Sequence, residues 1–178
     1  MIANKTYNNV INTLKNIGDT HLNITTTTTG DVFDIDLAKN TLFPLMHINP
    51  VNVTTGRVGL NYSFQIFVMD LVSQKKDWTE EEIQSAAWLN NEQEVLSGTL
   101  QTCVDIISIF RNSAYQSEQG VDDINYPTYF TDGDFTITPF TERFDNLLTG
   151  WVFNIEVEVE NDFQTCNIPM ANDLGQGE

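Results

Sequence analysis

The feature that most constrains the fold is a run near the C-terminus in which apolar and acidic residues alternate. From Trp151 to Glu160 the odd-numbered residues are apolar, and the last three even-numbered residues are Glu156, Glu158 and Glu160. Successive side chains of a strand point to opposite faces, so this run predicts a strand with one face against a core and the other in water. The three glutamates would form a row with a spacing of about 7 Å.

This row of glutamates belongs to an acidic chain. The 178 residues include 25 Asp and Glu against 8 Lys and Arg, which gives a formal net charge of −17 and a pI of about 4.1. From Asn112 to Glu178 every charged side chain except Arg143 is a carboxylate. This excess of negative charge argues against a protein that wraps around nucleic acid, because such proteins neutralise the phosphates with clustered Lys and Arg. It remains compatible with a non-adhesive surface close to DNA.

Length and composition predict one domain over residues 1–170 and a flexible tail at 171–178. A hydrophobic fraction of 40% and 11 Phe argue against disorder. The N-terminus lacks the apolar segment of a signal peptide, and no apolar run approaches the roughly 20 residues of a membrane helix. We therefore expect a cytoplasmic protein without membrane contact, with Cys103 and Cys166 as reduced thiols.

Apolar residues at helical spacing predict two main helices. The first covers 4–17 and is expected to end at Gly18. The second begins at 91–94, where Asn-Glu-Gln-Glu has the form of a capping box, and its apolar stripe runs to Phe110, with Arg111 near its end. Residues 73–90 are interpreted as an insertion that could hold a short helix, and residues 113–129 as a loop.

Alternation and turn residues predict four strands, at 41–48, 60–72, 130–139 and 147–160. Pro50 is expected to stop the first of them, with a turn at 51–59, and 141–149 is expected to be a short connection. The threonine run at 25–29 could be a strand edge or a mobile loop, and 31–37 could be a short strand or an extended arm. The fold class expected is α+β, with an antiparallel sheet of about four strands, two helices packed on one face, and extended loops or arms.

Motifs for catalysis are not evident in the sequence. It has no Gly-rich phosphate loop, no Gly-x-Ser-x-Gly elbow and no His-Glu-x-x-His pair. His21 and His47 are far apart in the sequence, and His47 is interpreted as a structural residue within a strand. Two cysteines without a second close histidine make a poor zinc site. We therefore expect a protein that is not an enzyme and has no cofactor or metal.

Pairs of carboxylates leave an alternative open. Acidic pairs such as Asp132 and Asp134 could bind a divalent cation, or in principle hydrolyse a glycosidic bond, although the spacing fits no EF-hand loop. The alternative function is therefore an anionic metal- or glycan-binding accessory module. The row of glutamates also has two interpretations. It could be only the solvated face of a strand, or Glu156, Glu158 and Glu160, with Asp162, could line a lumen or a seam between subunits. The absence of lysine from the row favours the second.

Several segments carry a resemblance to a known group of proteins. They are Phe43-Pro-Leu-Met-His-Ile48, Phe64–Val72, Asn91–Ile107, Phe144–Val159 and Cys166-Asn-Ile-Pro169. Together they resemble neck and tail-completion proteins of tailed bacteriophages, and in particular the tail-terminator-like ring proteins, including those of crAss-like phages. Apart from hydrophobic spacing, the individual residues that carry this resemblance are Asp70, Glu94, Leu96, Leu100, Asp105, Asp145, Gly150, Trp151 and Cys166. The stretch 78–90 is longer than the resemblance predicts.

The resemblance implies a structural protein of the virion, assembled in the cytoplasm of the host bacterium. Such a head-tail connector or tail terminator forms a ring about the phage axis, typically a hexamer or a dodecamer. It sits between portal and tail, surrounds the conduit through which DNA passes without specific binding, and docks onto neighbouring neck, portal and tail proteins. No catalysis is implied.

A ring requires contacts between unlike surfaces of neighbouring copies. The extended segments at 23–36 and 49–59 are the expected arms, which could clasp a neighbour or add a strand to its sheet. The candidate residues for contacts between subunits are Asp31, Asp34, Asp36, Val53 and Arg57.

Overall fold

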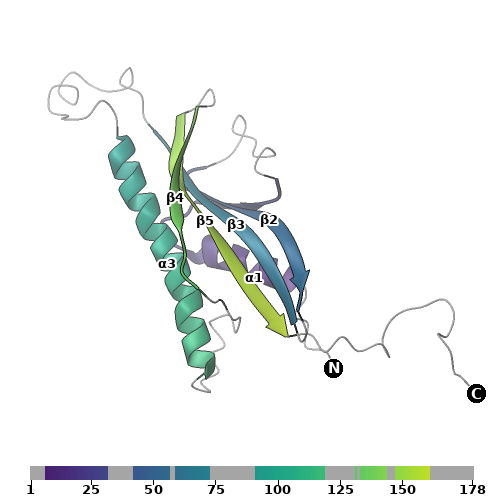
Figure 1. Ribbon diagram of the computed structural model, residues 1–178. Helices are drawn as coiled ribbons and strands as arrows, with labels where there is room; N and C mark the ends of the chain where they lie inside the picture. The colour runs from purple at the N-terminus through teal and green to yellow at the C-terminus, as the bar shows by residue number, and fades with distance from the viewer. Residues whose placement is uncertain are drawn as a thin grey trace, which may run out of the picture.

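The computed structural model describes residues 7–31, 42–56, 59–72, 91–118, 131, 133–143 and 147–160. They form an α+β fold in which two helices pack on one face of a five-stranded mixed sheet (Figure 1). The expected class is confirmed. The sheet has one strand more than expected and is not wholly antiparallel. The expected insertion at 73–90 and the tail at 171–178 lie outside the described residues.

The helices are α1 (Tyr7–Thr20) and α3 (Glu92–Glu118), and the strands are β1 (Thr26–Thr29), β2 (Leu45–Thr55), β3 (Gly59–Leu71), β4 (Ile137–Arg143) and β5 (Leu147–Glu160). The strand order is β1-β2-β3-β5-β4. Strand β1 runs parallel to β2, and every other neighbouring pair is antiparallel.

The additional strand is the threonine run, for which the sequence left two possibilities open. Strand β1 pairs with the first part of β2, from Thr26 opposite Leu45 to Thr29 opposite Ile48. Threonine is β-branched and suits a pleated surface. The chain between Thr29 and Leu45 supplies the dozen or so residues that a parallel connection requires. The expectation of a purely antiparallel sheet was therefore wrong at this edge.

Strand β2 does not stop at Pro50, which corrects the expected turn at 51–59. It continues to Thr55 and forms an antiparallel hairpin with β3, in which the backbone N–H of Gly56 donates to the Gly59 carbonyl at 2.8 Å. The register shifts between Pro50 and Asn52, which is a β-bulge. Pairing of β2 with β1 ends at Ile48, so Pro50 lies where its missing N–H breaks no bond to β1.

Strand β4 also lies elsewhere than the sequence suggested. It covers Ile137–Arg143 rather than 130–139, and it therefore includes residues expected to be a connection. The strand is at the edge of the sheet and pairs only with β5 among the described strands. An edge position tolerates Pro139, whose lack of an N–H would disrupt a central strand.

One core lies between the helices and the face of the sheet that they cover. Its strand side includes Tyr62, Phe64, Ile66 and Val68 of β3 and Phe153, Ile155, Val157 and Val159 of β5; its helix side includes Val10, Ile11, Leu14 and Ile17 of α1 and Cys103, Ile106, Ile107 and Phe110 of α3. The alternation predicted for β3 and β5 is thus confirmed, and Phe153 and Ile155 lie in the same core as the inward residues of α3.

Helix α1 continues past Gly18, which was expected to end it. A Cβ at Gly18 would meet the Oγ1 of Thr27 and, at 2.8 Å, the sulfur of Met46. The glycine is therefore a close-packing position, at which α1 approaches β1 and β2, and it does not mark a helix end. Helix α3 begins at Glu92 as expected but runs to Glu118, so Arg111 does not lie in its last turn.

Candidate functional site

The face of the sheet opposite the helices is here named the outer face, and it carries the predicted row of glutamates. Glu156 and Glu158 are exposed, and their backbone partners in β3 are Ser63 and Asn61. The amide of Asn61 donates a hydrogen bond of 3.2 Å to the Oε2 of Glu156. The backbone of Glu160 pairs with Gly59, but its side chain is outside the described part, and Asp162 lies beyond it.

The outer face is uniformly anionic where its charges are described. Among the side chains that the structure describes, the cations are Lys15 of α1 and Arg111 of α3, both on the helical layer. Arg111 lies 5.3 Å from the centre of the Phe135 ring and 3.8 Å from a carboxylate oxygen of Asp134. Hence neither cation neutralises Glu156 or Glu158.

The other end of the outer face is apolar. Leu45, Met69 and Leu148 are almost fully buried there, and Phe43, Phe67 and Phe140 pack against them. The rings of Phe67 and Phe140 meet edge to face with centroids 5.6 Å apart. The acidic half of the outer face thus lies toward the β2–β3 turn, and the apolar half lies toward the opposite end of β3.

His47, on the same face, has the structural role that the sequence suggested. It is 2% exposed and its ring joins β2 to β1. Its Nε2 lies 3.1 Å from the carbonyl oxygen of Gly30, which can only accept, so Nε2 carries the hydrogen. Its Nδ1 then accepts from the hydroxyl of Thr28 at 2.8 Å. Both ring nitrogens are used in holding the edge strand.

The end of the β2–β3 hairpin, here named the arm (Val51–Gly59), matches one of the predicted contact segments. Residues 51–56 are all exposed, including Val51 at 55% and Val53 at 48%. Past the bulge, Val53 pairs with Tyr62 and so points to the helix side of the sheet. Arg57 belongs to the arm in sequence but lies outside the described residues. Asp31 is exposed just after β1, whereas Asp34 and Asp36 are also outside the described residues.

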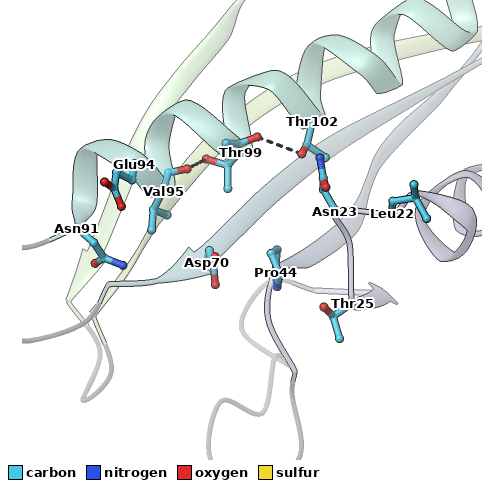
Figure 2. Close-up of a pocket in the computed structure, with 11 residues that line it drawn as sticks. Leu22, Asn23, Thr25, Pro44, Asp70, Asn91, Glu94, Val95, Thr99 and Thr102 are labelled. Carbon is cyan, nitrogen blue, oxygen red and sulfur yellow. Dashed lines mark hydrogen bonds between the residues drawn. The ribbon is translucent and has the colours of Figure 1, made fainter. Parts of the chain in front are cut away.

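A cleft that the sequence did not reveal lies at the other end of β3. It has a volume of about 570 Å³ and separates the N-terminal half of α3 from the loop between α1 and β1 (Figure 2). Its lining comprises Leu22, Asn23, Thr25, Pro44, Asp70, Asn91, Glu94, Val95, Gly98, Thr99 and Thr102. The hydroxyls of Thr99 and Thr102 bond to carbonyls one turn back in α3, at 2.6 and 3.1 Å.

Asp70 is the unusual residue of this cleft. It occupies the helix-facing position of β3 that follows Val68, near the end of the strand, where it lines the cleft (Figure 2). Desolvation raises the pKa of its carboxyl, and the bond of 2.7 Å from the Leu71 N–H opposes this only in part. A partly buried carboxylate with Glu94 across the same cleft favours a cationic occupant.

The wall of the cleft is braced by His21. Its Nδ1 accepts the N–H of Asn23 at 3.2 Å, and its Nε2 lies 3.5 Å from the Oδ2 of Asp105 in α3. Gln101 donates to the other oxygen of Asp105 at 2.8 Å. This network ties the loop after α1 to α3, and so fixes the width of the cleft.

One sequence signal could have indicated the cleft. The inward stripe of β3 is apolar from Leu60 to Val68, and Asp70 continues it with an acid. An acid at a core-facing position predicts either a buried partner or a gap in the core. Asp70 and Glu94 line the cleft, and Asp105 contacts His21 at its wall.

Within the described ranges no three His, Cys, Asp or Glu side chains gather in a way that could hold a metal ion. None of the helices described is long and apolar enough to cross a membrane. In comparisons with known proteins, no family model matches the chain, and no curated protein matches its sequence.

Proposed function

We propose that this protein is a structural subunit of a phage virion, which forms a ring in the neck or tail as a head-tail connector or tail terminator. In this function the ring surrounds the DNA conduit, docks onto adjacent neck, portal or tail rings, and performs no catalysis. The supporting sequence pattern is the one that resembles tail-terminator-like proteins.

The observation that carries the proposal is the division of the sheet into two unlike faces. The helices bury one face, whereas the other presents Glu156 and Glu158 to solvent with no described cation beside them. Duplex DNA carries one negative charge per about 1.7 Å of its axis, so a wall of this kind repels it and lets it slide. A DNA-binding protein would need the opposite charge.

A second observation supports an architectural role. The arm carries two exposed valines, Val51 and Val53, which a neighbouring copy could cover. Burial of both against a neighbour would stabilise an assembly by roughly 25 cal/mol per Å² of apolar surface removed from water. The proposal therefore predicts self-association into a closed ring of six or twelve copies.

The test is electron microscopy of the purified protein, followed by charge reversal. We expect class averages of rings with an opening wide enough for a duplex and with Glu156 and Glu158 facing it. The double variant Glu156→Lys/Glu158→Lys should form the same rings but retain DNA at about 150 mM salt, at which the unaltered ring does not.

The matched control is Asp19→Lys/Asp134→Lys, which changes the net charge by the same amount at exposed sites outside the outer face. If both double variants retain DNA equally, net charge rather than the outer face is responsible. Rings in which Glu156 and Glu158 are buried against basic partners, far from the opening, would contradict the conduit role. A monomer at every concentration would contradict the ring.

A further inference from the structure

Two buried hydroxyls of α3 line the cleft as hydrogen-bond acceptors. Thr99 is 4% exposed and Thr102 is 2% exposed, and both belong to the wall that α3 contributes (Figure 2). Each hydroxyl donates its hydrogen to a carbonyl of the helix, at 2.6 and 3.1 Å. A hydroxyl has one hydrogen and two lone pairs, so each oxygen can still accept a bond, and no described residue donates to either of them. The wall of α3 therefore asks for a donor.

Asp70 supplies a further acceptor from β3, on the other side of the cleft. Its Oδ1 accepts the N–H of Leu71 at 2.7 Å, whereas its Oδ2 has no hydrogen-bond partner among the described residues. Desolvation raises the pKa of this carboxyl, which means that its charged form is disfavoured when no cation lies beside it. A positively charged donor in the cleft would offset that cost and would satisfy the second oxygen.

The charges around the cleft favour a cation throughout. Glu94 lies exposed on its lining, and no Lys or Arg is found among the described residues of that lining. The cleft follows the first turns of α3, and the N-terminal end of a helix is itself partly positive. Glu92 and Glu94 lie in this first turn and offset that partial charge. The field inside the cleft is therefore set by the carboxylates.

The geometry of the acceptors selects one kind of cation. Divalent metal ions take six or more oxygen ligands, and the described residues hold no group of three that could bind a metal. A guanidinium pairs best with both oxygens of a carboxylate, but one oxygen of Asp70 is already used by Leu71. A quaternary ammonium prefers aromatic faces, which the described lining lacks. A primary ammonium has three separate N–H donors and suits separate acceptors.

The rest of the cleft suits a hydrocarbon stem attached to that ammonium. Val95 on α3, Pro44 before β2 and the fully exposed Leu22 give it apolar surface beside the acceptors. Its volume of about 570 Å³ is in the range of sites that bind small organic molecules. An alkyl chain lying on Leu22 would remove apolar surface from water, so the stem would add to the affinity of the charged end.

We propose that the cleft binds a primary alkylammonium ion, with the nitrogen between Asp70 and the hydroxyls of Thr99 and Thr102 and with the stem along Leu22 and Pro44. A free alkylamine and the lysine side chain of a partner protein share this chemistry. Such binding requires no assembly of the chain, so it goes beyond the ring proposed above and does not depend on it.

Isothermal titration calorimetry of the whole chain tests the site with two probes. They are n-butylammonium, which stands for a free amine, and Nα-acetyl-lysine methylamide, which stands for a lysine within a protein. At about pH 7 and about 20 mM salt, where screening is weak, we expect one-to-one binding of at least one probe. Asp70→Asn keeps the shape of the side chain and removes its charge, and it should weaken binding at least about tenfold. Thr99→Val should weaken it about threefold or more, because one acceptor is lost.

A matched control is needed because any cation is attracted to a chain with a net charge of −17. Asp134→Asn makes the same change in net charge at an exposed site on the helical layer, and it should bind both probes as the parent does. Thermal unfolding shows whether Asp70→Asn and Thr99→Val are folded, so a loss of binding is not confused with a loss of structure. Tetramethylammonium carries the same charge without any N–H, and it should bind at least about fivefold more weakly than n-butylammonium.

The outcomes decide between the site and a general attraction of cations. Tighter binding of the blocked lysine supports the site and indicates a partner's lysine, whereas tighter binding of n-butylammonium supports it and indicates a free amine. Equal weakening by Asp70→Asn and Asp134→Asn, or equal affinity for tetramethylammonium, would overturn the inference. So would the absence of binding by either probe at about 50 mM, a concentration at which even a ligand of this small size is detected. A chain that binds the probe and stays monomeric would contradict the ring alone.

Discussion

The indole N–H of Trp151 donates a hydrogen bond of 2.7 Å to the carbonyl oxygen of Leu96, and so joins strand β5 to helix α3. The side chain is only partly buried, and its ring packs against the edge of the main core. The residue thus fixes the position of the N-terminal half of α3, which forms one side of the cleft.

Substitution of Trp151 should separate its packing from its hydrogen bond. Trp151→Phe keeps most of the ring and removes the donor, so we expect a loss of about 1 kcal/mol in the free energy of unfolding. Trp151→Ala should cost about 3 kcal/mol, the lower end for truncated aromatic residues, because the site is not fully buried. Urea unfolding measures both. Asn154→Ala, exposed on the same strand, is the control and should change stability by less than about 0.5 kcal/mol. A Trp151→Phe variant as stable as the parent would contradict a role for the hydrogen bond, and equal costs for Phe and Ala would contradict a role for the packing of the ring.

Substitution of alanine for glycine should change the stability of the protein in opposite directions at two helical positions. Alanine normally favours a helix over glycine by about 1 kcal/mol. At Gly98 of α3 a Cβ meets nothing within 4 Å, so Gly98→Ala should stabilise by up to that amount. At Gly18 of α1 a Cβ would collide with Thr27 and Met46, so Gly18→Ala should destabilise by about 1–3 kcal/mol. Thermal unfolding of both variants checks the signs. Stabilisation by both would mean that α1 can move away from β1.

The bond between His47 and Thr28 should contribute to the attachment of the edge strand. Thr28→Val leaves the Nδ1 of a buried histidine without its donor, and we expect a loss of about 1–2 kcal/mol. In a double-mutant cycle with His47→Phe the second substitution at Thr28 should cost much less, with a coupling of about 1 kcal/mol. Denaturant unfolding of the four proteins measures it. Strict additivity would refute the pairing.

Asp70 should make stability depend on pH. Its folded pKa is raised above the unfolded value of 3.8, so the folded state binds the proton more tightly. The stabilisation from this residue is therefore fully present below about pH 3.8 and is lost as pH rises through the folded pKa. Asp70→Asn should be more stable than the parent at pH 7, with the difference vanishing near pH 3. Unfolding of dilute protein across this range checks it, with Asp19→Asn as an exposed control. A difference that grows toward acid pH would contradict the assignment.

The sequence predicted those parts of the fold that follow from local periodicity. Strand β3 alternates from Leu60 to Ile66 and β5 from Phe153 to Glu160, and the apolar stripe of α3 follows helical spacing, so their inward faces could be identified. The strands at the edges of the sheet were harder to predict, because neither a threonine run nor a strand containing proline has a local pattern of its own. Pro50 was expected to end a strand, but β2 continues past it, and Pro139 lies within the edge strand β4. Gly18 was expected to end a helix, whereas its role is set by residues distant in sequence.

The candidate sites also divide into features that the sequence could predict and features that it could not. The exposure of Glu156, Glu158 and Val53 could be anticipated, because each follows from a strand pattern or a turn. For the cleft the sequence holds only one hint, the acid at position 70 on the inward stripe of β3, because the lining comes from the loop after α1, the segment before β2, the end of β3 and the start of α3. Only the long-range pairing of strands and helices brings these segments together.

The bulge next to Pro50 has a consequence for how the arm can evolve. One unmatched residue decides that Val53 lies beside Tyr62 on the helix side, and not beside Asn61 on the side of the glutamates. Insertion or loss of a single residue in one strand of the arm would exchange its two sides. Homologous arms should therefore differ in length by even numbers of residues per strand. The length of the arm can then change between lineages while the apolar side chain at the position of Val53 stays on the helix side of the sheet.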